Sequence, residues 1–141
     1  SNHTSSGTTI TAWQRNGLTG FAKIGTGISV SSGIFSFPST GLYLIKGNFM
    51  FKIDTADESV GVVLQVTTND SSYNNIATGN TGAGGSDQYE MASFTTVFNV
   101  TNVSTHKCKI ITDSMASGNF VITSSTYTHT SLVFMRLGDS Q

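Results

Sequence analysis

The sequence predicts an all-β protein built as a sandwich or barrel of antiparallel strands, and three observations support this. No window of about ten residues combines clustered helix formers with the 3.6-residue apolar repeat of a stable helix. Short runs rich in β-branched and aromatic residues recur instead, separated by clusters of Gly, Ser, Thr and Asn. Charged residues make up only 11% of the 141 residues, and small polar residues that suit turns and exposed strand faces replace them.

Length and charge limit the domain count and the classes of partner. A chain of 141 residues is most simply one domain, which we place at residues 10–141. Residues 1–9, SNHTSSGTT, contain no aliphatic or aromatic side chain and predict a flexible tail or linker end. The net charge of −1 argues against nucleic acid as a partner. Apolar runs stay well below the roughly 20 residues that a bilayer requires, so we expect no membrane insertion.

The first third of the chain predicts short strands. ITAW (10–13) comes first, and FAKI (21–24) and ISV (28–30) then flank a Gly-Thr-Gly turn. IFSF (34–37) ends at Pro38, which has no N–H to donate to a ladder and therefore closes the strand.

Longer strands follow Pro38. The region of 69–88 is rich in loop-forming residues and predicts only a weak strand at 76–77. The stronger predictions are 42–51, 59–67, 89–101, 107–112, 119–123 and 130–137.

Three of these strands are apolar on both faces or nearly so. One is 94–100, where Phe94, Phe98 and Val100 share a face and Val97 lies on the other. Side chains alternate between the faces of a strand, and in 42–51 both alternating sets are hydrophobic, as they also are in 130–137. A second apolar face needs a cover, and without helices another copy of the chain is the simplest one. The alternatives are cover by long loops or tolerated exposure. The predicted oligomer interface consists of Leu42, Leu44, Met50, Val133, Met135 and Leu137.

The joint between two strands carries a family resemblance. The pattern Phe35-x-Phe37-Pro38-x-x-Gly41-x-Tyr43 resembles the hallmark of the tumour-necrosis-factor and complement globular-head superfamily. Independently of that likeness, Pro38 stops pairing, Gly41 permits a tight turn, and Tyr43 is expected in the core.

Two further segments match the same superfamily in the right order. These are the strand–turn–strand segment 92–110 and the closing strand SLVFMRLG (131–138). The sequence departs from the family at the turn of this hairpin, where Ser104-Thr105-His106 stands in place of the frequent Gly-Asp.

The resemblance implies a ten-stranded, TNF-like jelly roll that assembles as a tight homotrimer. The low charge and the Ser/Thr/Asn/Gly enrichment are similar to versions of this domain on tailed phages. A non-catalytic binding head of a phage fibre, spike or virion appendage is therefore the implied function, in a virion or extracellular location. Its partners would be a host-surface glycan or protein receptor and, through the N-terminal end, other virion proteins. The alternatives are a structural virion module that binds no receptor, and a secreted cytokine-like or carbohydrate-binding domain of a cellular organism.

Receptor contacts are expected on loops that a rigid sandwich presents. Aromatic and amide side chains suit a glycan or a protein receptor, although ordinary loop content is the alternative interpretation for each residue. The candidates are Tyr73, Asn74, Asn75, Asp87, Gln88 and Tyr89.

No residue set predicts catalysis, and we expect neither an enzyme nor a cofactor. The histidines, His3, His106 and His129, lack zinc-ligand spacing. The single cysteine, Cys108, is predicted to be a small buried hydrophobic residue. The acidic turn 54–58 could hold calcium, but it lacks the spacing of a calcium loop, and a solvated charged turn is the favoured interpretation.

Overall fold

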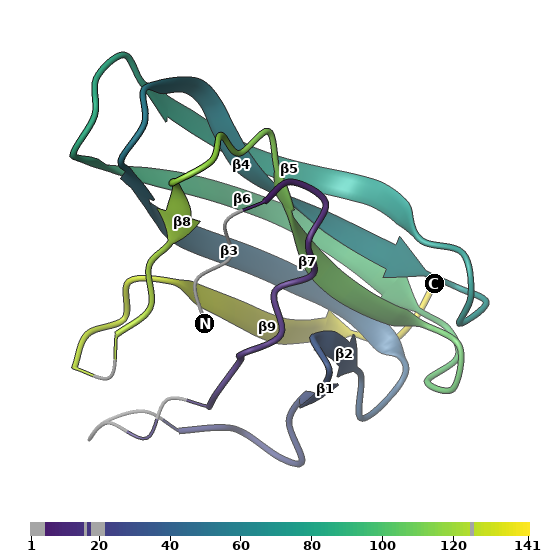
Figure 1. Cartoon of the computed structure of the whole chain (residues 1–141). Coiled ribbons are helices and arrows are strands. Elements are labelled where there is room, and N and C mark those ends of the chain that lie inside the picture. The colour runs from purple at the N-terminus through teal and green to yellow at the C-terminus, as the bar shows by residue number, and fades with distance from the viewer. Residues whose placement is uncertain (1–4, 16, 18–21, 125) are drawn as a thin grey trace.

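The computed structural model describes residues 5–15, 17, 22–124 and 126–141, which form two antiparallel sheets stacked face to face (Figure 1). These residues contain nine strands and no helix. The strands are β1 (Ser29–Ser31), β2 (Ile34–Ser36), β3 (Gly41–Ile53), β4 (Asp57–Thr67), β5 (Asn74–Ala83), β6 (Gln88–Val100), β7 (Lys107–Asp113), β8 (Phe120–Val121) and β9 (Ser131–Gly138).

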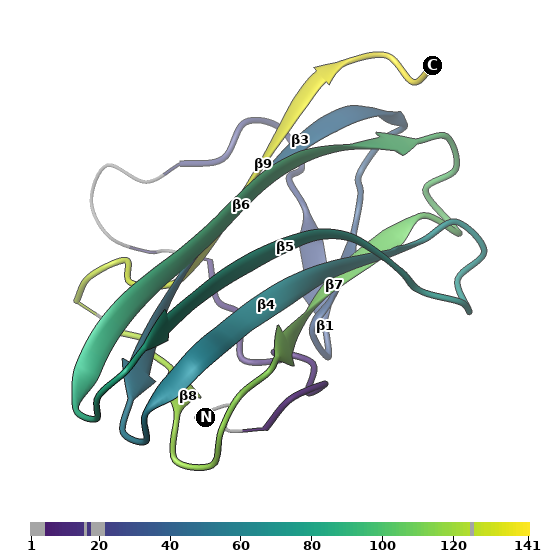
Figure 2. The same cartoon turned by 90° about the horizontal axis from the view of Figure 1, so that it is seen from above.

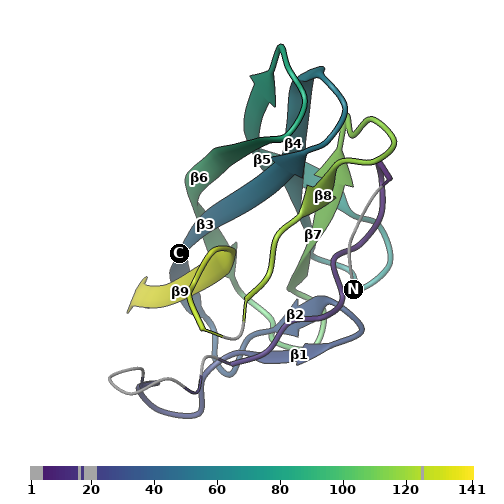
Figure 3. The same ribbon diagram turned by 60° about the vertical axis from the view of Figure 1, so that its left-hand side comes forward.

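One sheet has five strands in the order β1-β2-β7-β4-β5, and the other has four. In the four-stranded sheet, β6 pairs with β3 along its whole length, from Gly41 to Ile53. The opposite edge of β3 is shared: β9 pairs with residues 42–48 and β8 with residues 51–52 (Figure 3). β3 is therefore the strand on which the whole four-stranded sheet is assembled.

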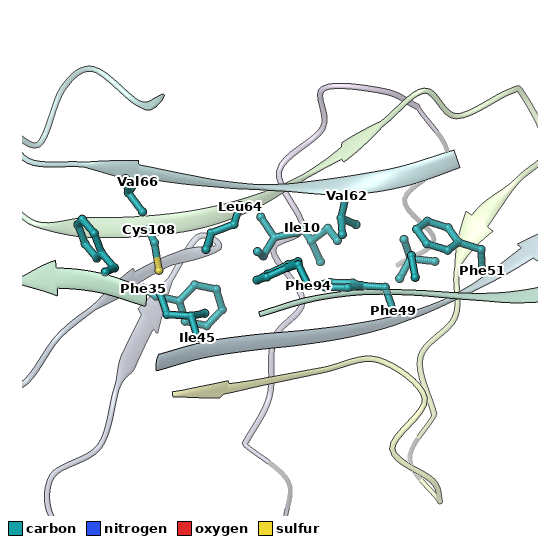
Figure 4. Packing of buried hydrophobic residues seen from close by; sticks show 14 of the residues in the cluster. Ile10, Phe35, Ile45, Phe49, Phe51, Val62, Leu64, Val66, Phe94 and Cys108 are labelled. Atoms are coloured by element: carbon teal, nitrogen blue, oxygen red, sulfur yellow. The ribbon is translucent and has the colours of Figure 1, made fainter. Parts of the chain in front are cut away.

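The core lies between the two sheets because each sheet turns one alternating set of apolar side chains inward. Ile45, Phe49 and Phe94 of the four-stranded sheet face Val62 and Leu64 of the other sheet (Figure 4). The rings of Phe49 and Phe94 stack with their centroids 5.9 Å apart. The predicted all-β sandwich is confirmed.

The joint between β2 and β3 has the structure that its residues predict. β2 ends just before Phe37 and Pro38, and Gly41 turns the chain with φ of 152°. A Cβ at Gly41 would lie 2.6 Å from the carbonyl oxygen of Gly138, so only glycine fits. The Tyr43 ring is buried, and its centroid lies 4.7 Å from that of the Phe37 ring. The Tyr43 hydroxyl donates to the Ser39 carbonyl oxygen at 2.9 Å.

The N-terminal region differs from the prediction. Residues 10–13 form no strand; Ile10 enters the core, and Trp13 packs edge-on against Phe35 at 5.4 Å. Residues 22–24 are also non-strand, and Phe21 lies outside the described residues. The contact of the N-terminal segment with β7 ends at Ile10, whose N–H donates to the Ile110 carbonyl oxygen at 2.9 Å. The described chain has nine strands rather than the predicted ten.

Part of the predicted tail is paired with β7. The Gly7 N–H donates to the Thr112 carbonyl oxygen at 2.8 Å, and the Thr112 N–H donates to the Thr8 carbonyl oxygen at 3.0 Å. β2 covers only residues 107–109 of this β7 edge, so the N-terminal segment continues where β2 stops. Residues 5–9 thus belong to the sandwich rather than to a free tail, and residues 1–4 lie outside the described chain.

A buried asparagine joins two loops at one end of the sandwich. Asn119 is fully buried, and its Oδ1 accepts from the N–H groups of Asp54 and Thr55 at 2.9 and 3.0 Å. Its Nδ2 donates to an Asp57 carboxylate oxygen at 3.0 Å. The β3–β4 turn is therefore held to the β7–β8 loop by one amide.

We expect Asn119→Ala to lower the free energy of unfolding by about 1–3 kcal/mol, because two backbone donors and one carboxylate lose their buried partner. Urea denaturation measures the change. The exposed Asn74 makes no side-chain hydrogen bond within the described chain, so Asn74→Ala is the matched control and should change stability by less than about 0.5 kcal/mol. Equal effects of the two substitutions would contradict the role of the buried amide.

Candidate functional site

The outer face of the four-stranded sheet carries an apolar surface, which we call the seam face. Register places Leu44 of β3 between Val97 of β6 and Met135 of β9, so three hydrophobic side chains form one row across the sheet. Further along, Met50 pairs with Met91. The full set is Leu42, Leu44, Met50, Met91, Val97, Val133, Met135 and Leu137.

All six residues of the predicted oligomer interface belong to the seam face, and pairing with β6 adds Met91 and Val97. In the single chain, Met135 is 53% exposed and Val97 51%. Lys46 and Asn48 interrupt the surface between its two apolar ends. The seam face is thus a hydrophobic patch with a polar middle, left uncovered by the described chain.

The six predicted receptor residues do not form one site. Tyr73, Asn74 and Asn75 lie at the start of β5, whereas Asp87, Gln88 and Tyr89 lie at the β5–β6 turn. β5 has ten residues, so the two groups are separated by roughly 30 Å at about 3.3 Å per residue. They stand at opposite ends of the sandwich (Figure 2).

Each group is anchored by a lysine. Lys109 Nζ lies 4.2 Å from the centre of the Tyr73 ring. The pKa of Tyr73 is raised, mainly because the side chain is partly buried and secondly because the Asp70 carboxylate is near. At the other end, Lys52 Nζ contacts Asp87 and lies 3.2 Å from Asp54 Oδ1 and 4.7 Å from the centre of the Tyr89 ring. These contacts hold both loops in place.

The histidines do not converge. His106 is buried, with Nε2 3.1 Å from Thr101 Oγ1 and Nδ1 3.1 Å from Thr105 Oγ1. His129 lies beside Tyr127, with ring centroids 5.9 Å apart, and His3 is outside the described residues. Within the described ranges, no three His, Cys, Asp or Glu side chains gather as a metal site would require.

In the acidic turn, the Asp57 carboxylate is already engaged by protein donors. Its Oδ2 accepts from the Ala116 N–H at 2.8 Å and from Asn119 Nδ2, and its Oδ1 accepts from the Ser59 N–H at 3.2 Å. These contacts favour a structural role for this carboxylate over calcium ligation.

Two comparisons by sequence give no match: no family model fits the chain, and no curated protein matches its sequence. Comparison of structures does find likenesses. Murine APRIL at pH 5.0 aligns with a TM-score of 0.63 and 17% identity, over 81% of this chain and 80% of that one. Eiger TNF from S. frugiperda aligns with a TM-score of 0.66 and 10% identity, over 81% and 71% of the two chains. The fold is a TNF-like jelly roll. At these identities the likeness establishes the fold alone.

The described residues contain no helix with the length and apolar character to cross a membrane.

Cys108 is buried on β7, and burial raises the pKa of its thiol. We expect the native protein to resist Ellman's reagent at pH 7 to 9, because the reactive thiolate is suppressed and the reagent has no access. The exposed turn residue Ser86 offers a matched control, since Ser86→Cys should label rapidly while Cys108 labels only after unfolding in guanidinium. Rapid labelling of Cys108 in the native state would contradict its assignment as an inert core residue.

Proposed function

We propose that this chain is a non-catalytic, trimeric binding head of a phage fibre, spike or virion appendage, and that it attaches to a glycan or protein receptor on the host surface. Other virion proteins would connect at its N-terminal end. The single observation that carries the proposal is the seam face. It is an exposed surface with apolar residues at both ends, on a domain whose TNF-like fold resembles a superfamily expected to assemble through such a face.

The physical case for assembly rests on exposure. Five seam-face residues, Met91, Val97, Val133, Met135 and Leu137, are each about half exposed in the single chain. Exposed apolar patches of this kind mark interaction surfaces. Three weak receptor sites on one trimer would also bind a surface with avidity that no single site provides.

The assignment to a virion rests on composition. Charged residues are 11% of the chain, and the Ser/Thr/Asn/Gly enrichment is similar to the phage versions of the domain. A secreted cytokine-like domain is the second candidate. The observation that favours it is the likeness in fold to murine APRIL and Eiger TNF. A structural module without a receptor is separated from both by the host-adsorption experiment below.

We expect Leu44→Asp and Met135→Asp each to convert the trimer into monomers or aggregates, because a charge would be buried in the centre of the seam face. Light scattering coupled to gel filtration measures the mass. Val103→Asp is the control, since Val103 is 38% exposed in the β6–β7 turn, away from the seam face, and should leave the mass unchanged.

A wild-type protein that is monomeric at micromolar concentration would overturn the proposed trimer. Binding is tested separately, by adsorption of labelled trimers to cells of the candidate host. Intact trimers that adsorb to no host would favour the structural module over the binding head.

A further inference from the structure

The outer face of the five-stranded sheet holds a shallow hollow of about 420 Å³ over β4, β5 and β7. Register explains why it lies there. One row across the three strands is Asp113, Gly61 and Asn80, and the next is Ile111, Val63 and Thr78. In the first row the central residue has no side chain, and the Asn80 amide reaches over it, with Oδ1 2.6 Å from the position that a Cβ of Gly61 would take. The hollow opens beside this amide, over Val63 and Thr78 of the next row.

The floor is apolar and the rim is polar. Val63 is 7% exposed at the bottom, and Ile76 contributes a further hydrophobic wall. Asn75, Thr78, Asn80 and Asp113 line the hollow around them. An apolar base with a few convergent polar groups is the general form of a small-ligand site.

Hydrogen bonds within the rim hold both amides in place. Asn75 Oδ1 accepts from Gln65 Nε2 at 2.9 Å, and Asn80 Oδ1 accepts from Thr78 Oγ1 at 2.6 Å. The Thr78 hydroxyl also contacts the Val62 carbonyl oxygen at 3.1 Å. Each amide uses one of its polar atoms in these contacts and keeps hydrogen-bonding capacity for a ligand. In the described part of the chain, the Asp113 carboxylate makes no hydrogen bond or ion pair.

We propose that this hollow binds one uncharged sugar unit of a host-surface glycan. The inference rests on the proposed function, since it names the ligand class and the place of attachment on the binding head. The two rim amides and one free carboxylate complement the hydroxyl groups of a sugar, which both accept and donate. The C–H face of the ring covers Val63 and Ile76 and removes apolar surface from water.

Charge selects an uncharged ligand over an acidic one. The Asp113 carboxylate repels a sialic or uronic acid, because two like charges would meet at the hollow. Lys109 lies on the same strand as Asp113, β7, four residues and therefore two rows away, and its ammonium group lies over the Tyr73 ring. It therefore does not neutralise Asp113.

The hollow and the seam face lie on different sheets of the sandwich. Assembly through the seam face thus leaves one hollow on each subunit, turned away from the sheet that carries that face. A shallow site with few polar contacts binds one sugar weakly, and three copies on one trimer compensate through avidity.

The test begins with the wild-type trimer on an array of neutral and acidic bacterial-surface glycans. The strongest neutral glycan is then titrated into ¹⁵N-labelled protein. The expected result is a shift of the side-chain NH₂ signals of Asn75 and Asn80. Asp113→Ala should weaken this binding by about tenfold or more, because a charge-assisted hydrogen bond is lost.

Glu58→Ala is the matched control. Glu58 is an exposed carboxylate outside the hollow with no side-chain partner in the described chain, and its removal should leave the affinity unchanged. Asp113→Asn should retain part of the binding, and all three variants should keep the wild-type mass.

Three results would overturn the inference: no neutral glycan bound, shifts confined to residues away from the hollow, or equal affinities of Asp113→Ala and Glu58→Ala. If trimers still adsorb to host cells in any of these cases, the proposed binding head is retained and only the sugar site in the hollow is rejected. If the protein neither assembles nor adsorbs, the proposed function itself fails.

Discussion

The pleat of β3 is the constraint on which the rest of the structure depends. Successive side chains of a strand point to opposite faces, and in β3 both faces are hydrophobic. Ile45 and Phe49 point into the core and are fully buried, whereas Leu42 and Leu44 point outward and are only partly covered. β6, β8 and β9 all align on β3, so its inner face sets the core and its outer face sets the surface that we propose for assembly.

The two sheets consequently present different outer surfaces. The four-stranded sheet shows the row Val97, Leu44 and Met135, which suits burial against another copy. The five-stranded sheet shows glycine, amides, a hydroxyl and a carboxylate around a small apolar floor, which suits a hydrated ligand. On the proposed function, assembly belongs to one face and recognition to the other.

Strands with strong apolar alternation could be predicted from the sequence, and strands held by their neighbours could not. β3 and β9 carry hydrophobic runs. The turn between β2 and β3 could be predicted because Pro38 cannot pair in a sheet and only glycine fits at position 41. β5, in contrast, is polar and glycine-rich, and the sequence predicts only a weak strand at 76–77. Its ten residues are strand because β4 pairs along them and β6 lies beside them. Conversely, residues 10–13 have strand-like composition but form no strand. Ile10 is buried in the core, and Trp13 packs against it.

The predictability of the sites follows the same division. The seam face is a property of alternation along β3 and β9, so six of its residues could be named in advance. The register with β6 was required to place Met91 and Val97 beside them. The predicted receptor residues are split because β5 spans the length between them. Only Asn75 of that set lines the hollow. The hollow itself is formed where Val63 of β4, Asp113 of β7 and polar residues of β5 come together across three strands, and no linear pattern contains that alignment.

Oxidation of the methionines by dilute hydrogen peroxide, read by mass spectrometry, tests the assembly of the seam face most directly. Met91 and Met135 are about half exposed in the single chain, whereas Met115 is buried in the core. If the seam face is closed by other copies, Met91 and Met135 will oxidise as slowly as Met115 in the assembled protein and rapidly once Leu44→Asp has separated the chains. If both oxidise in the wild-type protein as fast as they do in that variant, the seam face is open to solvent and the account of its assembly is wrong.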